Sequence, residues 1–444
     1  MSALGFPNGF LWGAATAAHQ VEGANDNNDW WDWEQIPGHI KNGDTSVVAC
    51  DWWKGERYRE DFDLAQSLNH NAHRLSVEWS RIEPREGEWN ADAIAFYRRV
   101  LIALRERGMM SLVTLHHFTN PRWLVAQGAW ETEKIVSHFE RFAEHVVREL
   151  GDLCDSWVTL NEPNVYVFSS YVNGNWPPGK KNFVLAMRVL ANMVRGHAAA
   201  YHAIHRVQPN ARVGVAYHIR TMYPANPRSS LNRAITNLQD RLFNRLFPQA
   251  LLDGQLVFPM SVGTRVPEAI GTQDFLGLNY YWSSRIAIDF TNPGELFGRR
   301  LAAKPWGLAN DTAQREWFGM GDIDPDGFGE TIRWLANYGN GKPIYITENG
   351  VCDSNDELRP HVLFAYLAAL HRAIQAGAPV QGYFHWSLVD NFEWIEGYGL
   401  RFGLIANDFA TQTRTPRPSA YLYARIAREN AIADELIEEY GHTN

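Results

Sequence analysis

Eight short runs of apolar and β-branched residues recur along the chain, and longer segments with helical periodicity separate them. Each run has the length and composition of a buried strand. The runs cover residues 10–15, 74–78, 111–116, 156–160, 212–217, 275–279, 344–347 and 382–386. The clearest helical segments cover residues 91–107, 133–150, 183–208, 327–338 and 358–376. Eight strands with helical crossovers predict a closed parallel (β/α)8 barrel of the α/β class, a TIM barrel.

Two other organisations are compatible with the length of 444 residues. One is a set of two or three domains, and the other is a doubly wound open sheet. No G-x-G-x-x-G motif follows an early strand, as the common nucleotide-binding version of the open sheet requires. The long connections after Leu160, Tyr217 and Asn279 are interpreted as loop insertions at the C-terminal face of the barrel. We therefore expect residues 1–444 to form a single catalytic barrel domain.

The composition excludes several classes of protein. With 45% hydrophobic and 20% charged residues, the chain can build a large core and is not disordered. A net charge of −9 argues against a nucleic-acid partner. No apolar stretch approaches 18 residues, and the first 20 residues lack the basic region of a signal peptide. Three widely spaced cysteines without a C-x-x-C pair argue against disulfides and a thiolate zinc site. We expect a cytoplasmic protein with no membrane association.

Polar and aromatic side chains stand at the ends of the predicted strands. In a parallel barrel the chemistry takes place at the carboxyl ends of the strands and on the loops that follow them. Residues at or just after these ends include carboxylates, amides, imidazoles and aromatic rings: Gln20, Glu22, Arg74 to Glu78, His116, His117, Asn161, Glu162, Asn279 to Tyr281, Glu348, Asn349 and Trp386. Such a ring of side chains predicts an active site in the barrel mouth.

Two of these strands end in nearly the same way, in TLNEP at 159–163 and ITENG at 346–350. Each places a glutamate beside an asparagine, and Glu162 and Glu348 would be brought together across the barrel. Two carboxylates flanking one bond are what glycoside hydrolysis requires. One must stay protonated near neutral pH while the other stays ionised. A single N-E-P tripeptide is more simply a helix cap before Pro163, but the second motif favours the catalytic interpretation.

Four longer motifs make the sequence resemble glycoside hydrolase family 1, the β-glucosidase family. The opening F-P-x-x-F-L-W-G-A-A-T-x-A-x-Q-x-E-G covers residues 6–23. The motifs T-L-N-E-P and I-T-E-N-G follow, and G-Y-F-x-W-S-L-x-D-N-F-E-W-x-x-G-Y-x-x-R-F-G covers residues 382–403. The resemblance therefore extends over almost the whole chain.

The resemblance implies a retaining mechanism on a (β/α)8 barrel, with no cofactor and no metal. Glu162 matches the family's acid/base and Glu348 its nucleophile. Arg74 matches the arginine beside the nucleophile, where its charge would keep Glu348 ionised and lower the pKa of that carboxyl. A buried ion pair in the barrel core is the alternative for Arg74. Tyr281 matches the tyrosine that donates a hydrogen bond to the nucleophile.

The sugar-binding positions of the family are also present. The matching residues, which would contact the terminal sugar (the glycone), are Gln20, His117, Asn161, Asn279, Trp386, Glu393, Trp394 and Phe402. Glu393 suits neighbouring hydroxyls and would repel a 6-phosphate, so unphosphorylated sugars are favoured. One position departs from the family, because Phe118 stands where tryptophan is usual. The loss of an indole N–H there would relax discrimination at the outer hydroxyls of the sugar.

The sequence thus predicts a retaining β-glucosidase that removes terminal non-reducing β-D-glucosyl residues and also accepts β-fucosides and β-galactosides. Its partners would be small β-glycosides and oligosaccharides, with polysaccharide degradation as its setting, and homo-oligomerisation is left open. The alternatives are a mainly transglycosylating relative and a non-catalytic sugar-binding relative. The second of these expects a missing catalytic glutamate, and both are present. Trp306 and Trp317 lie in a long loop that could form the wall for the leaving group (the aglycone).

Overall fold

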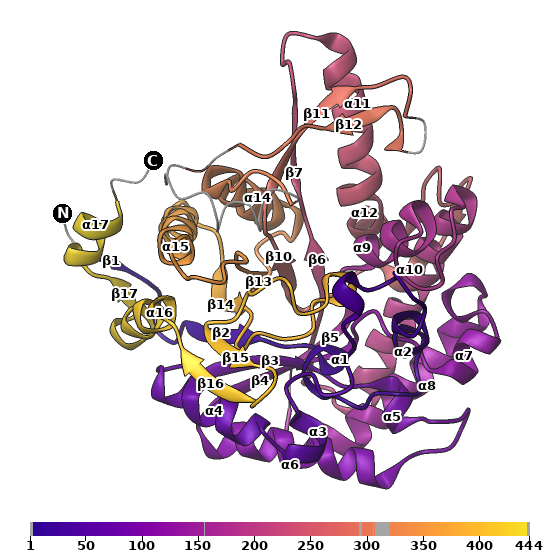
Figure 1. The fold of residues 1–444 in the computed structure, drawn as a ribbon. Coiled ribbons are helices and arrows are strands. Elements are labelled where there is room, and N and C mark those ends of the chain that lie inside the picture. The colour runs from indigo at the N-terminus through magenta and orange to yellow at the C-terminus, as the bar shows by residue number, and fades with distance from the viewer. Residues whose placement is uncertain (1–2, 155, 293–294, 305, 307–319, 442–444) are drawn as a thin grey trace.

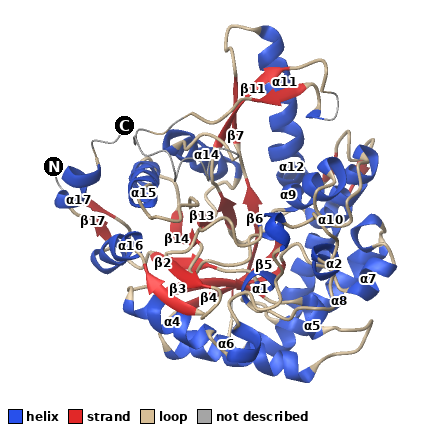
Figure 2. Cartoon of the chain, in the orientation of Figure 1, coloured by secondary structure: helices blue, strands red, loops and turns tan. Residues whose placement is uncertain are grey.

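The computed structural model describes residues 3–154, 156–292, 295–304, 306 and 320–441. Its centre is a closed barrel of eight parallel strands, which confirms the predicted fold class (Figures 1 and 2). Barrel neighbours follow one another along the chain, and the last strand pairs with the first. All eight predicted strands are present: β2 (Leu11–Ala15), β3 (Ala72–Ser76), β4 (Met110–His116), β5 (Ser156–Asn161), β6 (Arg212–His218), β10 (Leu276–Asn279), β13 (Ile344–Asn349) and β14 (Val380–Trp386).

The five predicted helices also form and lie outside the barrel (Figure 2). Side-chain caps define where several of them begin. Asn90 accepts hydrogen bonds from the backbone at the start of one helix, and Asp324 does the same for another. Their bounds lie within two residues of the prediction: α6 (Ala91–Glu106), α8 (Lys134–Leu150), α10 (Phe183–Val207), α14 (Pro325–Tyr338) and α15 (Arg359–Gln375).

Shorter helices complete the outer layer and the barrel mouth. They are α1 (Ala18–Val21), α2 (Asp29–Glu34), α3 (Trp52–Gly55), α4 (Tyr58–Ser67), α5 (Trp79–Ile82), α7 (Arg122–Ala126), α9 (Pro163–Val167), α12 (Leu246–Asp253), α16 (Pro418–Glu429) and α17 (Asp434–Tyr440). A short antiparallel pair, β1 (Leu4–Gly5) and β17 (Ala431–Ile432), joins the two ends of the described chain. Another antiparallel pair, β15 (Ile405–Asp408) and β16 (Thr413–Pro416), lies beyond the last barrel strand.

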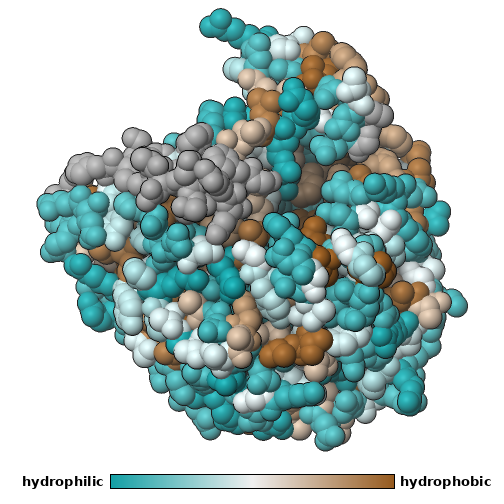
Figure 3. All heavy atoms as spheres, viewed as in Figure 1, coloured by the Kyte–Doolittle hydropathy of each residue, from teal (hydrophilic) through white to brown (hydrophobic). Residues whose placement is uncertain are grey.

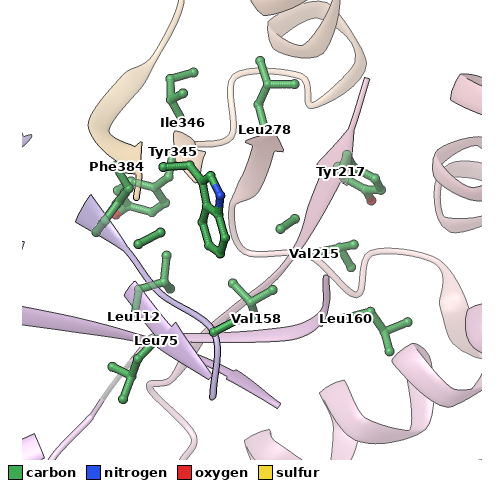
Figure 4. Packing of buried hydrophobic residues seen from close by; sticks show 14 of the residues in the cluster. Leu75, Leu112, Val158, Leu160, Val215, Tyr217, Leu278, Tyr345, Ile346 and Phe384 are labelled. Atoms are coloured by element: carbon green, nitrogen blue, oxygen red, sulfur yellow. The ribbon is translucent and has the colours of Figure 1, made fainter. Parts of the chain in front are cut away.

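Apolar side chains fill the space between the strands and their covering helices. Leu75, Val158, Val215 and Ile346 come from four different barrel strands and are all but inaccessible to solvent (Figure 4). Burying a side chain of this size contributes about 1.5–3 kcal/mol. Gly214 in β6 is required by close packing, since a Cβ atom there would lie 2.6 Å from the carbonyl oxygen of Phe275. The barrel is therefore a packed frame that fixes where each strand ends.

Two of the predicted insertions pair with each other instead of forming independent loops. The connection after β6 contains β7 (Thr221–Pro224) and α11 (Ser230–Asp240), and the connection after β10 contains β11 (Ser283–Ile288) and β12 (Gly298–Arg300). β11 pairs with β7 in parallel and with β12 in antiparallel orientation. We call these three strands the insertion sheet. Together with α11 it projects beyond the barrel (Figure 1).

The surface drawn in Figure 3 is mainly hydrophilic, with hydrophobic residues scattered among the polar ones. None of the helices in the described part of the chain combines the length and the apolarity that crossing a bilayer requires.

Candidate active site

A cavity of about 300 Å³ opens at the carboxyl ends of the barrel strands, and both candidate glutamates line it. Glu348 is the fifth of the six residues in β13, and Glu162 follows β5 directly, before Pro163 begins α9. Glu162 has a left-handed backbone with φ of 44°, which is uncommon for a residue with a side chain. The barrel thus brings together two carboxylates that lie far apart in the sequence.

Both carboxylate oxygens of Glu348 accept short hydrogen bonds. Nη1 of Arg74 lies 2.5 Å from Oε1, and the hydroxyl of Tyr281 lies 2.5 Å from Oε2. The guanidinium of Arg74 is fully buried and also donates to Asn161 Oδ1 at 2.6 Å and to the carbonyl oxygen of Thr347 at 3.2 Å. These contacts hold the carboxylate in one orientation and stabilise its charged form.

Burial has the largest effect on the pKa of Glu348. Burial raises this pKa to about 7, while Arg74 opposes the shift and the nearby charge of Glu162 adds to it. The expected effect of Arg74, which lowers the pKa, is therefore present. Removing the carboxylate from water outweighs its attraction to Arg74. Glu348 therefore ionises near neutral pH.

Glu162 is held by two different partners, both at Oε1. Asn279 donates to this oxygen through Nδ2 at 2.8 Å, and Nδ1 of His218 lies 3.2 Å from it. Asn279 also donates to Asn161 Oδ1 at 3.1 Å, so one amide connects the surroundings of the two glutamates. The two carboxylates thus have different environments, with an arginine and a phenol at Glu348 and an amide and an imidazole at Glu162.

Nine of the twelve predicted site residues line the cavity, and three lie behind it. The lining residues are Glu162, Glu348, Tyr281, His117, Asn161, Trp386, Glu393, Trp394 and Phe402. Arg74, Gln20 and Asn279 are buried beneath them. Nε2 of Gln20 donates to Glu393 at 3.2 Å and to Asn391 at 2.9 Å. Gln20 therefore lies against Glu393 and Asn279 against Glu162, and their expected contact with the sugar stays a prediction.

Aromatic rings form the wall of the cavity around Glu393. Trp394 stacks on His117 with ring centres 6.0 Å apart and an angle of 14°, and His117 stacks in turn on Trp386 at 6.1 Å. Trp30 packs behind Trp394 at 4.5 Å. Burial, followed by the charge of Glu348, raises the pKa of Glu393 to about 8. Flat rings beside a hydrogen-bonding carboxyl can bind the apolar face and the hydroxyls of a sugar.

Several lining residues were missed by the sequence reasoning, above all His218, Arg220, Trp282 and Arg300. His218 is the last residue of β6, and Arg220 follows two positions later. The rule that polar residues at strand ends form the site was applied to seven strands but not to this one, where it would have found both. Trp282 and Arg300 come from the insertion around β11 and β12 and carry no comparable signal.

Two further expectations concern the aglycone wall and the absence of a metal site. Trp317 lies outside the described residues, so its predicted place in an aglycone wall stays a prediction. Among residues 3–154, 156–292, 295–304, 306 and 320–441 there is no group of three or more His, Cys, Asp or Glu side chains arranged to hold a metal ion.

Comparison with known proteins places this geometry among the glycosidases. A family model described as glycosyl hydrolase family 1 matches residues 3–432. Beta-glucosidase A of Thermotoga maritima is 31% identical over 460 residues, covering 98% of this chain and all of that protein. A beta-galactosidase of Sulfolobus acidocaldarius is 32% identical, covering 98% and 97%. The solved beta-glycosidase from Pyrococcus horikoshii superposes with a TM-score of 0.89 at 38% identity, covering 99% of both chains.

Proposed function

This chain belongs to glycosyl hydrolase family 1, and on that premise we propose that Glu348 is its nucleophile and Glu162 its general acid and base. The chain is a β-glycosidase that hydrolyses its substrate with retention, which is the activity of the family. The observation that carries the assignment of roles is the pair of short hydrogen bonds from Arg74 and Tyr281 to Glu348. They favour the charged form of one carboxylate and hold it in one orientation, as a nucleophile needs.

The reaction proceeds in two steps. Glu348 attacks the anomeric carbon while Glu162 gives its proton to the departing oxygen, and a covalent glycosyl ester forms as the aglycone leaves. Glu162, now ionised, then takes a proton from water, and the water oxygen displaces Glu348 from the sugar. When Glu348 becomes an ester, Arg74 keeps its hydrogen bonds to Asn161 and to the carbonyl oxygen of Thr347. The negative charge of the glutamate pair passes to Glu162 in the first step and returns to Glu348 in the second.

The glycone occupies the aromatic end of the cavity. Trp386 provides the floor, and His117, Asn161, Glu393 and Trp394 bind the hydroxyls, with Phe402 closing the wall. Gln20 contributes by fixing Glu393, and Asn279 by fixing Glu162. The substrates are glycosides and oligosaccharides with a terminal non-reducing β-D-glucosyl residue.

Phe118 makes the sugar preference broad. Its ring lines the cavity and packs edge-on against Trp176 at 4.8 Å and Trp394 at 5.3 Å, so the aromatic surface is kept while an indole donor is absent. β-Fucosides and β-galactosides are therefore accepted beside β-glucosides. Comparing kcat/KM for the three 4-nitrophenyl glycosides tests this. A preference for glucose above about 10³-fold, which corresponds to about 4 kcal/mol, would contradict it.

We also propose how the chain is organised, in which compartment the enzyme works and where its substrates come from. The whole chain works as one catalytic domain, because both insertions that pair in the insertion sheet begin at barrel strands. Three widely spaced cysteines favour the cytoplasm, where oligosaccharides from polysaccharide degradation would be the substrates. Sedimentation of the purified protein would establish whether it assembles with further copies of itself.

The deciding experiment removes the nucleophile. In Glu348→Ala, turnover of 4-nitrophenyl β-D-glucoside should fall by several orders of magnitude, and added azide should restore part of it with an inverted glycosyl azide as the product. Glu330→Ala is the matched control, since Glu330 is an exposed glutamate outside the cavity. Full activity in Glu348→Ala, or rescue with retained configuration, would place the nucleophile at another residue.

A further inference from the structure

The catalytic cavity continues into a second cavity of about 190 Å³, and two arginines line both. The residues shared by the two cavities are Val165, Ser169, Arg220 and Arg300. None of the proposed glycone residues lines the second cavity. The shared residues therefore mark the end of the site toward which the leaving group extends. Both arginines belong to the insertions, with Arg220 between β6 and β7 and Arg300 at the end of β12.

Arg220 holds its charge without an acidic partner. Its guanidinium lies between the rings of Phe243 and Trp282, 5.0 Å from each ring centre. Its Nε atom is buried and has no hydrogen-bond partner, and no ion pair joins Arg220 to another of the described residues. Asn244 fixes the backbone of Arg220 from both sides, at 3.1 Å and 2.8 Å. A half-buried guanidinium whose buried Nε donor has no partner is costly unless a bound group completes it.

A second arginine, Arg300, adds to the positive charge at this end of the cavity. Arg300 lies close enough to affect Arg220, and its Nη1 donates to the carbonyl oxygen of Met320 at 3.0 Å. Burial, followed by the charge of Arg300, lowers the pKa of Arg220 to about 9, while Glu162 and the exposed Glu295 oppose this shift. At neutral pH the guanidinium is still protonated.

Glu295 is an exposed residue that lines the second cavity and raises the pKa of Arg220, but no ion pair joins it to either arginine within the described part of the chain. Two further acidic side chains near this end are held by other groups. Glu396, which also lines the catalytic cavity, pairs with Lys41 at 3.0 Å. Glu162 is held by Asn279 and His218 at the catalytic centre. The leaving-group end thus carries two guanidinium groups, and that of Arg220 lies between aromatic rings.

We propose that this end of the site binds an aglycone that carries a carboxylate, with Arg220 as the main contact and Arg300 as the second. The inference rests on the proposed function, because it assigns the leaving-group side of the same reaction. A guanidinium presents parallel N–H donors that match a carboxylate, and the rings of Phe243 and Trp282 offer flat apolar faces beside it. The carboxylate could belong to an aromatic acid or to a uronic acid, and both share this chemistry.

The test compares substrates that differ only in charge. We would measure kcat/KM for 3-carboxyphenyl and 3-carbamoylphenyl β-D-glucosides, and in a second arm for β-1,4-linked glucosyl-glucuronic acid and cellobiose. The wild-type enzyme should prefer the carboxylate in at least one arm by about tenfold, as expected for a hydrogen bond to a charged group. A preference in the aryl arm alone identifies an aromatic acid, and one in the disaccharide arm alone identifies a uronic acid.

Variants then assign the preference to its residue. Arg220→Met should bring the ratio of the two substrates close to one, and Arg220→Lys should keep part of it. Because both substrates use the same Glu162, an indirect effect on the acid cancels in the ratio. Arg299→Met removes the same charge from a neighbouring exposed residue that pairs with Asp289 and lines neither cavity, so it should leave the ratio unchanged. If Arg220→Met does not fold, Arg300→Gln should still lower the ratio about threefold.

Two results would overturn the inference. One is equal or better turnover of the neutral substrate by the wild-type enzyme in both arms. The other is a carboxylate preference that survives in Arg220→Met, or in Arg300→Gln where the first variant does not fold. If the wild-type enzyme hydrolyses no glycoside at all, the proposed function fails first, so the two failures are distinguishable.

Discussion

The two ends of the catalytic cavity are built on different parts of the molecule. At the glycone end, His117 and Trp386 stand at barrel strand ends, are buried and stack on each other. At the aglycone end, Arg220 and Arg300 belong to the insertions, and Arg300 is exposed. A packed barrel frame can hold reacting groups within fractions of an ångström, whereas an added sheet can change without disturbing them. In the proposed mechanism the barrel frame therefore positions the reacting groups, and the insertions shape the side of the cavity where we propose that the leaving group binds.

The largest expected effect tests the catalytic role of Glu162, which lies at the end of a barrel strand. In Glu162→Gln the acid is lost but the shape is kept, so kcat/KM for glycosides with poor leaving groups should fall about 10³-fold. With a 2,4-dinitrophenyl leaving group the loss should be far smaller, because that group departs without a proton. Glu396→Gln removes another carboxylate from the lining of the same cavity and should cost less than about tenfold. Equal losses with both leaving groups would show that Glu162 is not the acid.

The second prediction compares packing in the two regions. Leu278 in β10 and Ile286 in β11 are both buried. Leu278→Ala should lower the free energy of unfolding of the whole protein by about 2–5 kcal/mol. Ile286→Ala should instead loosen the insertion sheet and speed hydrogen exchange in β7, β11 and β12, with the barrel strands still protected. Exchange measured by mass spectrometry checks this, and equal deprotection of the barrel by both variants would contradict it.

The third prediction concerns the pKa of Glu348. Activity needs the ionised carboxylate, so kcat/KM should fall as the pH drops through the pKa of Glu348, which burial raises to about 7. Tyr281→Phe removes a donor that stabilises the charged form, so this pKa should rise and the acid limb should move upward by about one pH unit. The loss of activity should therefore be larger at pH 6 than at pH 8.

The matched control for this variant is Tyr280→Phe. Tyr280 is equally buried, but its hydroxyl contacts Thr221 and the backbone of Asp324 instead of Glu348. The acid limb should stay where it is in this variant. A shift of the limb in both variants would mean that it reports general loosening of the site and not the charge of Glu348.

The difference between the barrel and the insertions also explains what could be predicted from the sequence. The eight strands and five helices were predicted because hydrophobic periodicity is local, and the strand-end rule located Glu162 and Glu348. The pairing of β7 with β11 was not predictable, because it depends on contacts between segments about 60 residues apart that carry no shared pattern.

Two properties of the site also required the structure. The pKa of Glu348 depends on how completely the surrounding residues exclude water, which no motif encodes. The hydrogen bond from Gln20 to Glu393 joins residues 373 positions apart, and no motif predicts it. The structure therefore separated the candidate residues that line the cavity from those that contact the lining residues from behind.

The smallest expected effect concerns Phe118, at the glycone end. Phe118→Trp would return an indole N–H to a ring that already lines the cavity beside Trp394. One neutral hydrogen bond to an outer hydroxyl should raise the ratio of kcat/KM for glucoside over galactoside about fivefold. Phe118→Leu removes the ring and adds no donor, so it should lower both rates without raising the ratio. An unchanged ratio in Phe118→Trp would mean that the other residues of the glycone end set the sugar preference.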